Sequence, residues 1–311
     1  MPRLAAIDIG SNSALLLIAE SLPAGAWRVL LDTRRTVRMT QTPQAPGRIA
    51  EAAIAALEAV LAEYSELIEK LDAGDHVVGG ATQALRAAEN GREIAAQLQQ
   101  RFGWPIRILA AGEEARLSYL AAASGIGQIP AERLVIDVGG GSTELVLGCD
   151  QRIVKSTSIP IGAVSLSAEL RLSDAIAEPE LSRVAAQTAA ALESEIADFG
   201  TPPMTTLLVG GTASTLAALF LGQRIFDPEL VHGVELQTDW IGSQLRKLAQ
   251  LDLDERRRLI SFDPDRAEII IGGILVLERL LATLKIKSAI VSNRGLRWGL
   301  LIDSAVAGNA D

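Results

Sequence analysis

The stretch "LAAIDIGSNSALLLIAE", Leu4 to Glu20, places an apolar run and an acidic residue before a Gly-Ser-Asn-Ser turn and a second apolar run. Aliphatic residues on both sides of a Gly, Asn and Ser cluster predict a β-hairpin, and a turn of this composition can also bind phosphate through its backbone. The stretch alone leaves both interpretations open. A second occurrence of the same pattern would indicate a device that the protein uses repeatedly.

The pattern does recur, at "LVIDVGGGSTELVLG" from Leu134 to Gly148. Five positions are identical in register: Ile136, Asp137, Gly139, Ser142 and Leu145 align with Ile7, Asp8, Gly10, Ser13 and Leu16. Two such hairpins, each opening its own half of the chain, indicate a duplicated domain. A third glycine turn, in "LLVGGTASTLAALF" from Leu207 to Phe220, joins an apolar strand directly to a helix.

Composition limits the class of protein. With 311 residues and 49% hydrophobic content, the chain is long enough for two domains with a core each. A net charge of -9 argues against nucleic-acid or anionic-membrane binding, but backbone N–H groups, a metal and a few arginines could still hold a phosphorylated ligand. The single cysteine, Cys149, fits a reducing compartment, and we expect it to pack as a small hydrophobe. No targeting segment or membrane span is visible, so we expect a cytoplasmic protein.

The order of predicted elements is that of an α/β protein. Three strands come first, the third in "WRVLLDTRRTVRMT" before the loop Thr42–Gly47, and helices then alternate with strands. The segment Ser124–Arg133, rich in Gly, Ser and Pro, is the best boundary, which predicts domains at residues 1–125 and 126–311. The helix containing "IIIGGILVL", residues 269–277, could be core or a dimer face, and core is the commoner answer.

Two pairs of carboxylates are candidates for chemistry. Asp137 ends a strand and Glu144 follows just across the turn, so both could lie on one side of the loop and hold Mg²⁺ beside a phosphate. The alternative is that Asp137 bonds its own turn while Glu144 faces solvent. Glu113 and Glu114, in "AAGEEARLSYL", open a helix where they could serve only the helix dipole, or could overlook a cleft.

Eight motifs together resemble one family. They are "AAIDIGSNS", "ATQALR", "GEEARL", "VIDVGGGSTELV", "VGGTASTLAAL", "VHG", "RAEIIIGG" and "GLRWGLL", in the order found in the exopolyphosphatase/guanosine pentaphosphate phosphohydrolase (Ppx/GppA) family. The resemblance covers nearly the whole chain. It implies an α/β fold of two duplicated domains of the actin-like, heat-shock-protein and sugar-kinase (ribonuclease H-like) type, with a cleft between them.

The resemblance also implies roles for named residues. Glu114 would be the catalytic base, Asp137 and Glu144 would hold Mg²⁺ or Mn²⁺, and Arg86 would face the substrate passage rather than remain a solvated helix charge. The phosphate-binding residues would be Ser11, Asn12, Ser13, Gly140, Gly141 and Ser142, with Gly211 and Thr212 further in. Asp8 and Glu113 are auxiliary candidates, Asp8 orienting its loop or a metal-bound water. His76 and His232 would be structural. Trp298 departs from the glutamate usual in the family motif, and "VRMTQTPQAPG" departs from the usual Arg-Leu-Gly stretch.

The reaction implied is in-line attack of water on a terminal phosphoryl group without a covalent intermediate. We expect an exopolyphosphatase acting on short or medium chains of inorganic polyphosphate, because the chain lacks the HD-like C-terminal extension of longer relatives and is acidic. The close alternative is a guanosine pentaphosphate (pppGpp) 5′-phosphohydrolase, with ppGpp as a possible inhibitor. A non-catalytic sensor of these ligands and a sugar or acetate kinase are less favoured. A homodimer is conceivable, and nucleic-acid or membrane partners are not expected.

Overall fold

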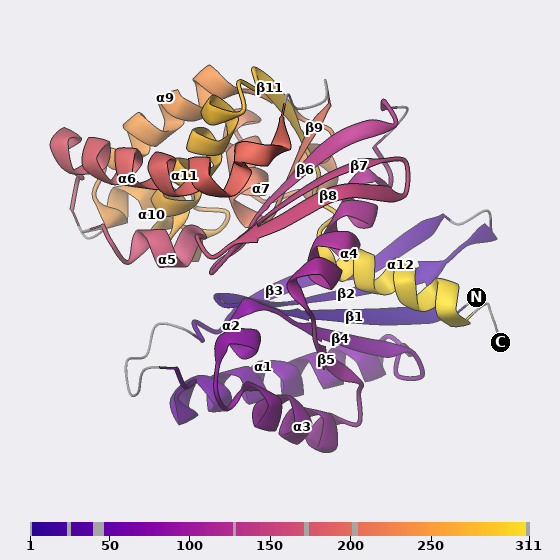
Figure 1. The fold of residues 1–311 in the computed structure, drawn as a ribbon. Coiled ribbons are helices and arrows are strands. Elements are labelled where there is room, and N and C mark those ends of the chain that lie inside the picture. Colours follow the sequence, from indigo (N-terminus) through magenta and orange to yellow (C-terminus); the bar gives the residue numbers. More distant parts are fainter. Residues whose placement is uncertain are drawn as a thin grey trace. The chain divides into compact units, whose positions relative to one another are not determined.

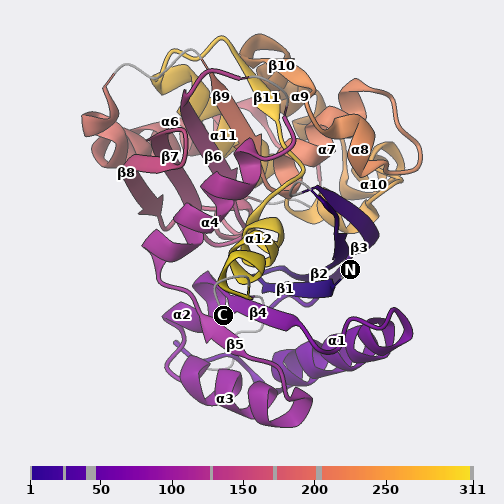
Figure 2. The same cartoon turned by 90° about the vertical axis from the view of Figure 1, so that its right-hand side faces the viewer.

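The structure, a computed structural model, describes residues 2–23, 26–39, 47–126, 129–170, 174–200 and 205–308 (Figures 1 and 2). It divides into two compact units, Met1–Leu117 with Leu296–Asp311, and Ser118–Gly295. The predicted loop Thr42–Gly47 lies outside the described residues apart from Gly47, as do residues 127 and 128 of the predicted boundary segment. The domain boundary at residue 125 stays a prediction.

The first unit is built on a five-stranded sheet in the order β3-β2-β1-β4-β5. Its strands are β1 (Arg3–Ile9), β2 (Ser13–Ser21), β3 (Trp27–Thr36), β4 (Val77–Ala81) and β5 (Ile106–Ile108). The first three strands pair antiparallel, and β4 and β5 join in parallel. Helices α1 (Glu51–Lys70), α2 (Gln83–Ala87) and α3 (Gly91–Phe102) belong to this unit, and Figure 1 shows α1 and α3 on one face of the sheet with α12 (Leu296–Gly308) on the other.

The second unit repeats this plan with one strand added, in the order β10-β11-β9-β6-β7-β8. Its strands are β6 (Glu132–Val138), β7 (Thr143–Cys149), β8 (Arg152–Ile159), β9 (Thr206–Val209), β10 (Glu235–Gln237) and β11 (Ser288–Val291). Read from β8 to β11, the order matches that from β3 to β5. The duplication predicted from the two hairpins and the α/β class predicted from the order of the elements are therefore confirmed. Two α/β halves with a common strand order are what the resemblance implies.

Helices fill out the second unit. They are α5 (Ala163–Ser167), α6 (Glu178–Ile196), α7 (Gly211–Phe220), α8 (Pro228–Val231), α9 (Thr238–Ala249), α10 (Leu253–Leu259) and α11 (Ile270–Thr283), with short 3-10 turns at Ala197–Phe199 and Pro264–Glu268. Helix α4 (Ala111–Ala123) contributes its first half to the first unit and the rest to the second.

The apolar helix α11 is core, as predicted, because every residue from Ile270 to Leu277 is buried. No helix in the described ranges combines the length and apolarity needed to cross a membrane. The prediction for Cys149 is wrong: the thiol residue is exposed. It is the last residue of β7 and pairs with the exposed residues Glu132 and Arg152 at the open end of the strands, where no core reaches it.

Candidate functional site

The two hairpins that open the units have the same turn geometry. In each, the glycine N–H donates to the carbonyl of the serine three residues on: Gly10 to Ser13 and Gly139 to Ser142, both at 2.9 Å. The ladder pairs Asp8 with Leu15 in the first hairpin and Asp137 with Glu144 in the second. The predicted register is therefore correct, and only the second hairpin carries two carboxylates opposite each other.

The carbonyl groups of the second turn accept hydrogen bonds from the start of α5. The N–H of Ala163, at the start of α5, donates to the carbonyl of Gly139, and the N–H of Val164 donates to that of Gly140. In a planar trans peptide the C=O and the following N–H point in opposite directions. The N–H groups of Gly140 and Gly141 therefore point away from α5, and neighbouring N–H groups with a common direction form a concave anion-binding site.

The first turn is fastened in the same way by the chain after β3. The N–H of Met39 donates to the carbonyl of Ser11 at 3.0 Å, and the N–H of Val37 donates to that of Asn12 at 2.8 Å. The Asn12 side-chain amide donates to Ser13 Oγ at 3.3 Å, and the three side chains at residues 11–13 are buried. Because these side chains are buried and the carbonyls of Ser11 and Asn12 are already bonded, this turn would contact a phosphate mainly through the N–H groups of Asn12 and Ser13.

The carboxylate pair of the second hairpin is a fixed, polar feature. Glu144 is 3% exposed, and its Oε1 accepts hydrogen bonds from Ser142 Oγ at 2.7 Å and from Ser158 Oγ at 2.8 Å. The alternative in which Glu144 faces solvent is therefore excluded. Asp137 is half-buried and directly opposite.

These two carboxylates fit a magnesium ion. They supply hard oxygen donors, and Mg²⁺ takes only one or two protein carboxylates while keeping several waters or phosphate oxygens. Among the described residues there is no group of three or more His, Cys, Asp and Glu placed to hold a metal, so a metal relying entirely on protein ligands does not fit.

The third glycine turn lies beside this pair. Gly210 has φ of 92° and precedes α7; a Cβ there would lie 2.9 Å from Asp137 Oδ1 and 2.7 Å from the Val138 carbonyl. This position therefore requires glycine. Thr212, predicted to line the site, is 1% exposed and its hydroxyl packs against Gly273 of α11, so its contribution to a ligand would come from the backbone.

Arg266 is a further candidate residue that was not predicted from the sequence. A Cβ on Gly211 would overlap the Arg266 guanidinium, so this cation lies directly against the first residue of α7. Its Nε is 3.6 Å from Asp263 Oδ2. Arg266 opens the motif "RAEIIIGG", which carried the resemblance but received no role. A cation beside the N-terminus of a helix is a combination suited to a phosphate group.

The predicted base, Glu114, is buried in the first turn of α4 and pairs with Arg86. Arg86 Nη1 donates to Glu114 Oε2 at 2.6 Å and to the carbonyl of Leu109 at 2.9 Å, while Nη2 donates to Gln83 Oε1 at 2.8 Å. Burial raises the pKa of Glu114 above its ordinary value, and the hydrogen bond and charge of Arg86 oppose that rise only in part. Arg86 is thus not a solvated helix charge.

Its neighbour Glu113 lies in a different environment. The Glu113 carboxylate pairs with the half-exposed Arg107 at 2.9 Å, and its side chain is 31% exposed. Of these two adjacent glutamates, Glu113 therefore lies nearer the surface and Glu114 is buried. Glu114 has the perturbed pKa that is typical of a reacting group.

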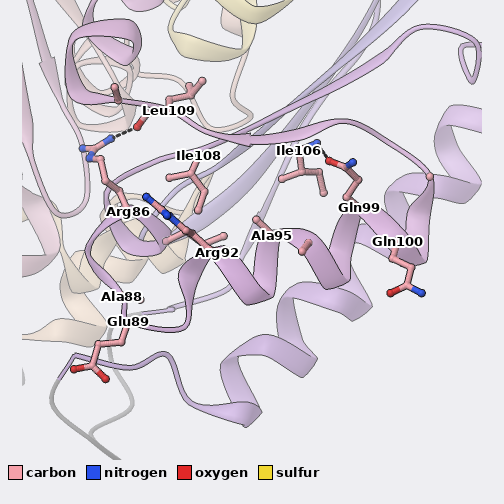
Figure 3. A pocket seen from close by; sticks show the side chains of 14 residues that line it. Arg86, Ala88, Glu89, Arg92, Ala95, Gln99, Gln100, Ile106, Ile108 and Leu109 are labelled. Atoms are coloured by element: carbon pink, nitrogen blue, oxygen red, sulfur yellow. Dashed lines mark hydrogen bonds between the residues drawn. The ribbon is translucent and has the colours of Figure 1, made fainter.

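Arg86 also lines a groove of about 950 Å³ beside α3 (Figure 3). Its floor includes Ala95, Ile106 and Ile108. Figure 3 shows Arg86 at one end and Gln100 at the other, with Arg92 and Gln99 between them. The groove therefore begins at the residue that contacts Glu114.

Asp8 interacts electrostatically with Arg297, a cation of its own unit whose side chain is 15% exposed. Burial lowers the pKa of Arg297, but Asp32, whose Oδ2 accepts from Nη2 at 2.9 Å, and then Asp8 more than offset this, so the pKa of Arg297 lies above its ordinary value. An Asp8 charge balanced by Arg297 favours orientation of the loop over metal ligation. Trp298, beside Arg297, is 3% exposed.

Of the two histidines, His232 has the kind of contact expected of a structural residue, whereas the role predicted for His76 stays a prediction. The Asn293 N–H donates to His232 Nδ1 at 3.3 Å, and burial lowers the pKa of His232. The backbone carbonyl of His76 accepts from the N–H of Ala5, while the residue itself is exposed.

Known proteins with similar sequences and structures indicate the same family as the motifs. The sequence profile of the Ppx/GppA phosphatase family matches residues 17–307. Exopolyphosphatase 2 of Mycobacterium tuberculosis is 32% identical over 302 residues, covering 93% of each chain, and exopolyphosphatase 1 of Mycobacterium leprae is 26% identical over 323 residues, covering 99% of this chain and 92% of that one. The crystal structure of the Aquifex aeolicus Ppx/GppA family member is 31% identical, covers 99% of both chains and superposes with a TM-score of 0.83. The chain therefore belongs to the Ppx/GppA phosphatase family.

Proposed function

We propose that this chain is an exopolyphosphatase that hydrolyses the terminal phosphate of inorganic polyphosphate with the help of Mg²⁺ or Mn²⁺. The observation that carries the proposal is the pair Asp137 and Glu144, held opposite each other beside the N–H groups of Gly140 and Gly141. Oxygen donors for a metal next to backbone donors for phosphate are what phosphoryl transfer requires. The names of the mycobacterial relatives support polyphosphate as the substrate.

The candidate site residues have distinct roles in the proposed reaction. Asp137 and Glu144 would hold the metal, which when bound supplies positive charge to the phosphate oxygens. The N–H groups of the glycine turns and the Arg266 guanidinium would bind the terminal phosphates. Glu114 would accept a proton from the attacking water, and its raised pKa makes it a stronger base than an ordinary glutamate. Attack in line with the leaving oxygen then needs no covalent intermediate.

The groove beside α3 supports a substrate passage at Arg86. Polyphosphate is a linear polyanion, so the phosphates beyond the reacting end need a path with cations along it. Arg86 and Arg92 both line the groove, although Glu89 also does and the floor is apolar. With few cations in the groove and a net charge of -9, we infer a preference for short or medium chains.

The second candidate is hydrolysis of the 5′-terminal phosphate of pppGpp, which shares the terminal phosphoryl chemistry and the family. Both activities would use the same carboxylates, so site geometry does not separate them. A non-catalytic sensor is less well supported, because Glu114 has the buried, perturbed carboxyl group that binding alone does not need.

Release of phosphate tests the proposal directly. Purified protein with Mg²⁺ is incubated with polyphosphates of graded length and, separately, with pppGpp, and free phosphate is measured. We expect release from polyphosphate that stops when the metal is chelated. Turnover of the nucleotide alone would establish the second candidate, and binding of either ligand without turnover would establish a sensor.

A further inference from the structure

An exposed apolar surface lies on the second unit, around the C-terminal end of α7, the loop that follows it, and α8. Five large hydrophobic side chains within eleven residues of sequence are exposed: Phe220 at 51%, Leu221 at 43%, Ile225 at 85%, Phe226 at 38% and Leu230 at 61%. These residues are here named the α7–α8 surface. In the described residues only Val29 and Val154 join them as exposed large hydrophobics, so such side chains are concentrated here. Concentrated apolar exposure of this kind marks interaction sites.

The backbone that carries this surface is held in a defined shape. Helices α7 and α8 pack against each other, and they lie side by side in Figure 2. Between them the Asp227 N–H donates to Gln223 Oε1 at 3.0 Å, which closes the loop, and Asp227 Oδ1 caps α8 by accepting from the N–H of Glu229 at 3.0 Å. The apolar side chains are therefore presented by ordered structure rather than by a frayed end.

Two aromatic rings of this surface, Phe220 and Phe226, each pack against another aromatic ring of the second unit. Phe220 packs edge-on against Trp240 with ring centroids 5.2 Å apart, and Phe226 stacks on Phe262 at 6.3 Å. Each ring thus has one side fixed while a large part of it is still exposed. Rigid aromatic residues that lose little freedom on binding are typical anchors of protein interfaces.

Charges of both signs accompany the apolar residues. Arg224 immediately precedes Ile225 and Phe226, and Glu229 immediately precedes Leu230; both charged residues are exposed. A two-fold axis through an interface brings each residue of one copy to the partner position on the other, so a surface with both charges can pair Arg224 with Glu229 twice. A surface shaped for an acidic or a basic partner would carry one sign instead.

We propose that the α7–α8 surface is the interface of a homodimer, in which two copies bury their apolar residues against each other and pair Arg224 with Glu229 reciprocally. The proposal is independent of the assigned activity, because it uses none of the residues placed in the catalytic or binding machinery. It also gives the homodimer a location, since the apolar helix α11 considered from sequence is buried in the core.

The first test measures the mass of the full chain by sedimentation velocity over a dilution series. We expect a dimer that dissociates on dilution, and Ile225→Glu or Leu230→Glu should raise its dissociation constant about tenfold or more. The matched control is Val154→Glu on β8, because Val154 is as exposed as Leu230, at 61%. It should leave the dissociation constant unchanged. All the substituted side chains are exposed, so circular dichroism should show unaltered folding.

The second test uses charge reversal. Arg224→Glu and Glu229→Arg should each weaken the dimer, and the double variant should restore it, because the reciprocal pair is then re-formed with its signs exchanged. A wild-type chain that stays monomeric overturns the proposal, and the surface must then be covered from within the chain or by a different protein. A dimer insensitive to Ile225→Glu, equally sensitive to Val154→Glu, or not restored by the double reversal also overturns it.

Discussion

At the scale of single residues, the adjacent glutamates of α4 differ in burial, and this difference assigns the catalytic role to only one of them. Glu114 is 8% exposed and contacts Arg86, whereas Glu113 pairs with the half-exposed Arg107. We predict that Glu114→Gln lowers kcat for phosphate release by a factor of about 10² to 10⁴, the usual contribution of a general base. Glu113→Gln, one residue away, should stay close to wild type. Equal losses in both variants would contradict the assignment of the base.

The contact between Arg86 and Glu114 predicts the pH dependence. Glu114 must be ionised to accept a proton, so activity should fall as the pH drops through its pKa, which burial raises above the ordinary 4.5. Arg86 stabilises the ionised carboxylate and so limits that rise. In Arg86→Met the pKa should therefore rise further, and the acid limb of the kcat/KM profile should move to higher pH.

Measuring the profile separates this effect from simple loss of substrate binding. A residue that only binds phosphate would change the height of the profile and leave the limb in place. An acid limb that is unchanged, or that moves to lower pH in Arg86→Met, would contradict the proposed coupling.

At the scale of elements, the third glycine turn places the backbone where a side chain would not fit. Gly210 combines a left-handed φ of 92° with close approach to Asp137 and Val138. We predict that Gly210→Ala destabilises the protein by about 1–3 kcal/mol, from backbone strain and displacement of its neighbours. Gly242, in the interior of α9 of the same unit, has only ordinary contacts at 3.7 Å or more, so Gly242→Ala should be neutral or stabilising. Urea unfolding of both variants measures the difference, and equal effects would contradict the argument.

Strand β8 helps to orient the Glu144 carboxylate of the β6–β7 hairpin, together with Ser142 of the hairpin itself. Ser158 of β8 lies opposite Glu144 and donates to Oε1 at 2.8 Å. Removing a group that orients a metal ligand typically weakens metal affinity by about 10–100-fold. We predict that Ser158→Ala raises the Mg²⁺ concentration for half-maximal activity towards the lower end of that range, with kcat at saturating metal less affected. Ser156→Ala, an exposed serine two residues away on the same strand, is the control and should leave the metal requirement unchanged.

At the scale of the whole molecule, the sequence predicted what is repeated or periodic. The two hairpins, their register and the buried α11 follow from residue spacing, because alternation and helical periodicity are local. The contacts of Arg86 with Glu114 and of Arg266 with Gly211 join residues far apart in the chain, which no local pattern encodes. For the same reason, the assignment of α12 to the first unit emerges only once the chain is folded.

The groove beside α3 gives a prediction that depends on substrate length. If phosphates beyond the reacting end enter the groove, the charge of Arg92 acts only on chains long enough to reach it. Arg92→Ala should then raise KM for longer polyphosphates about two- to fivefold, as fits an exposed ionic contact, and leave KM for tripolyphosphate unchanged. Arg101→Ala removes the same charge from the same helix, but Arg101 pairs with Glu58 and does not line the groove, so it should change neither value. A loss that is uniform across chain lengths, or shared by Arg101→Ala, would show that the groove does not guide the chain and that Arg92 contributes only to the general field.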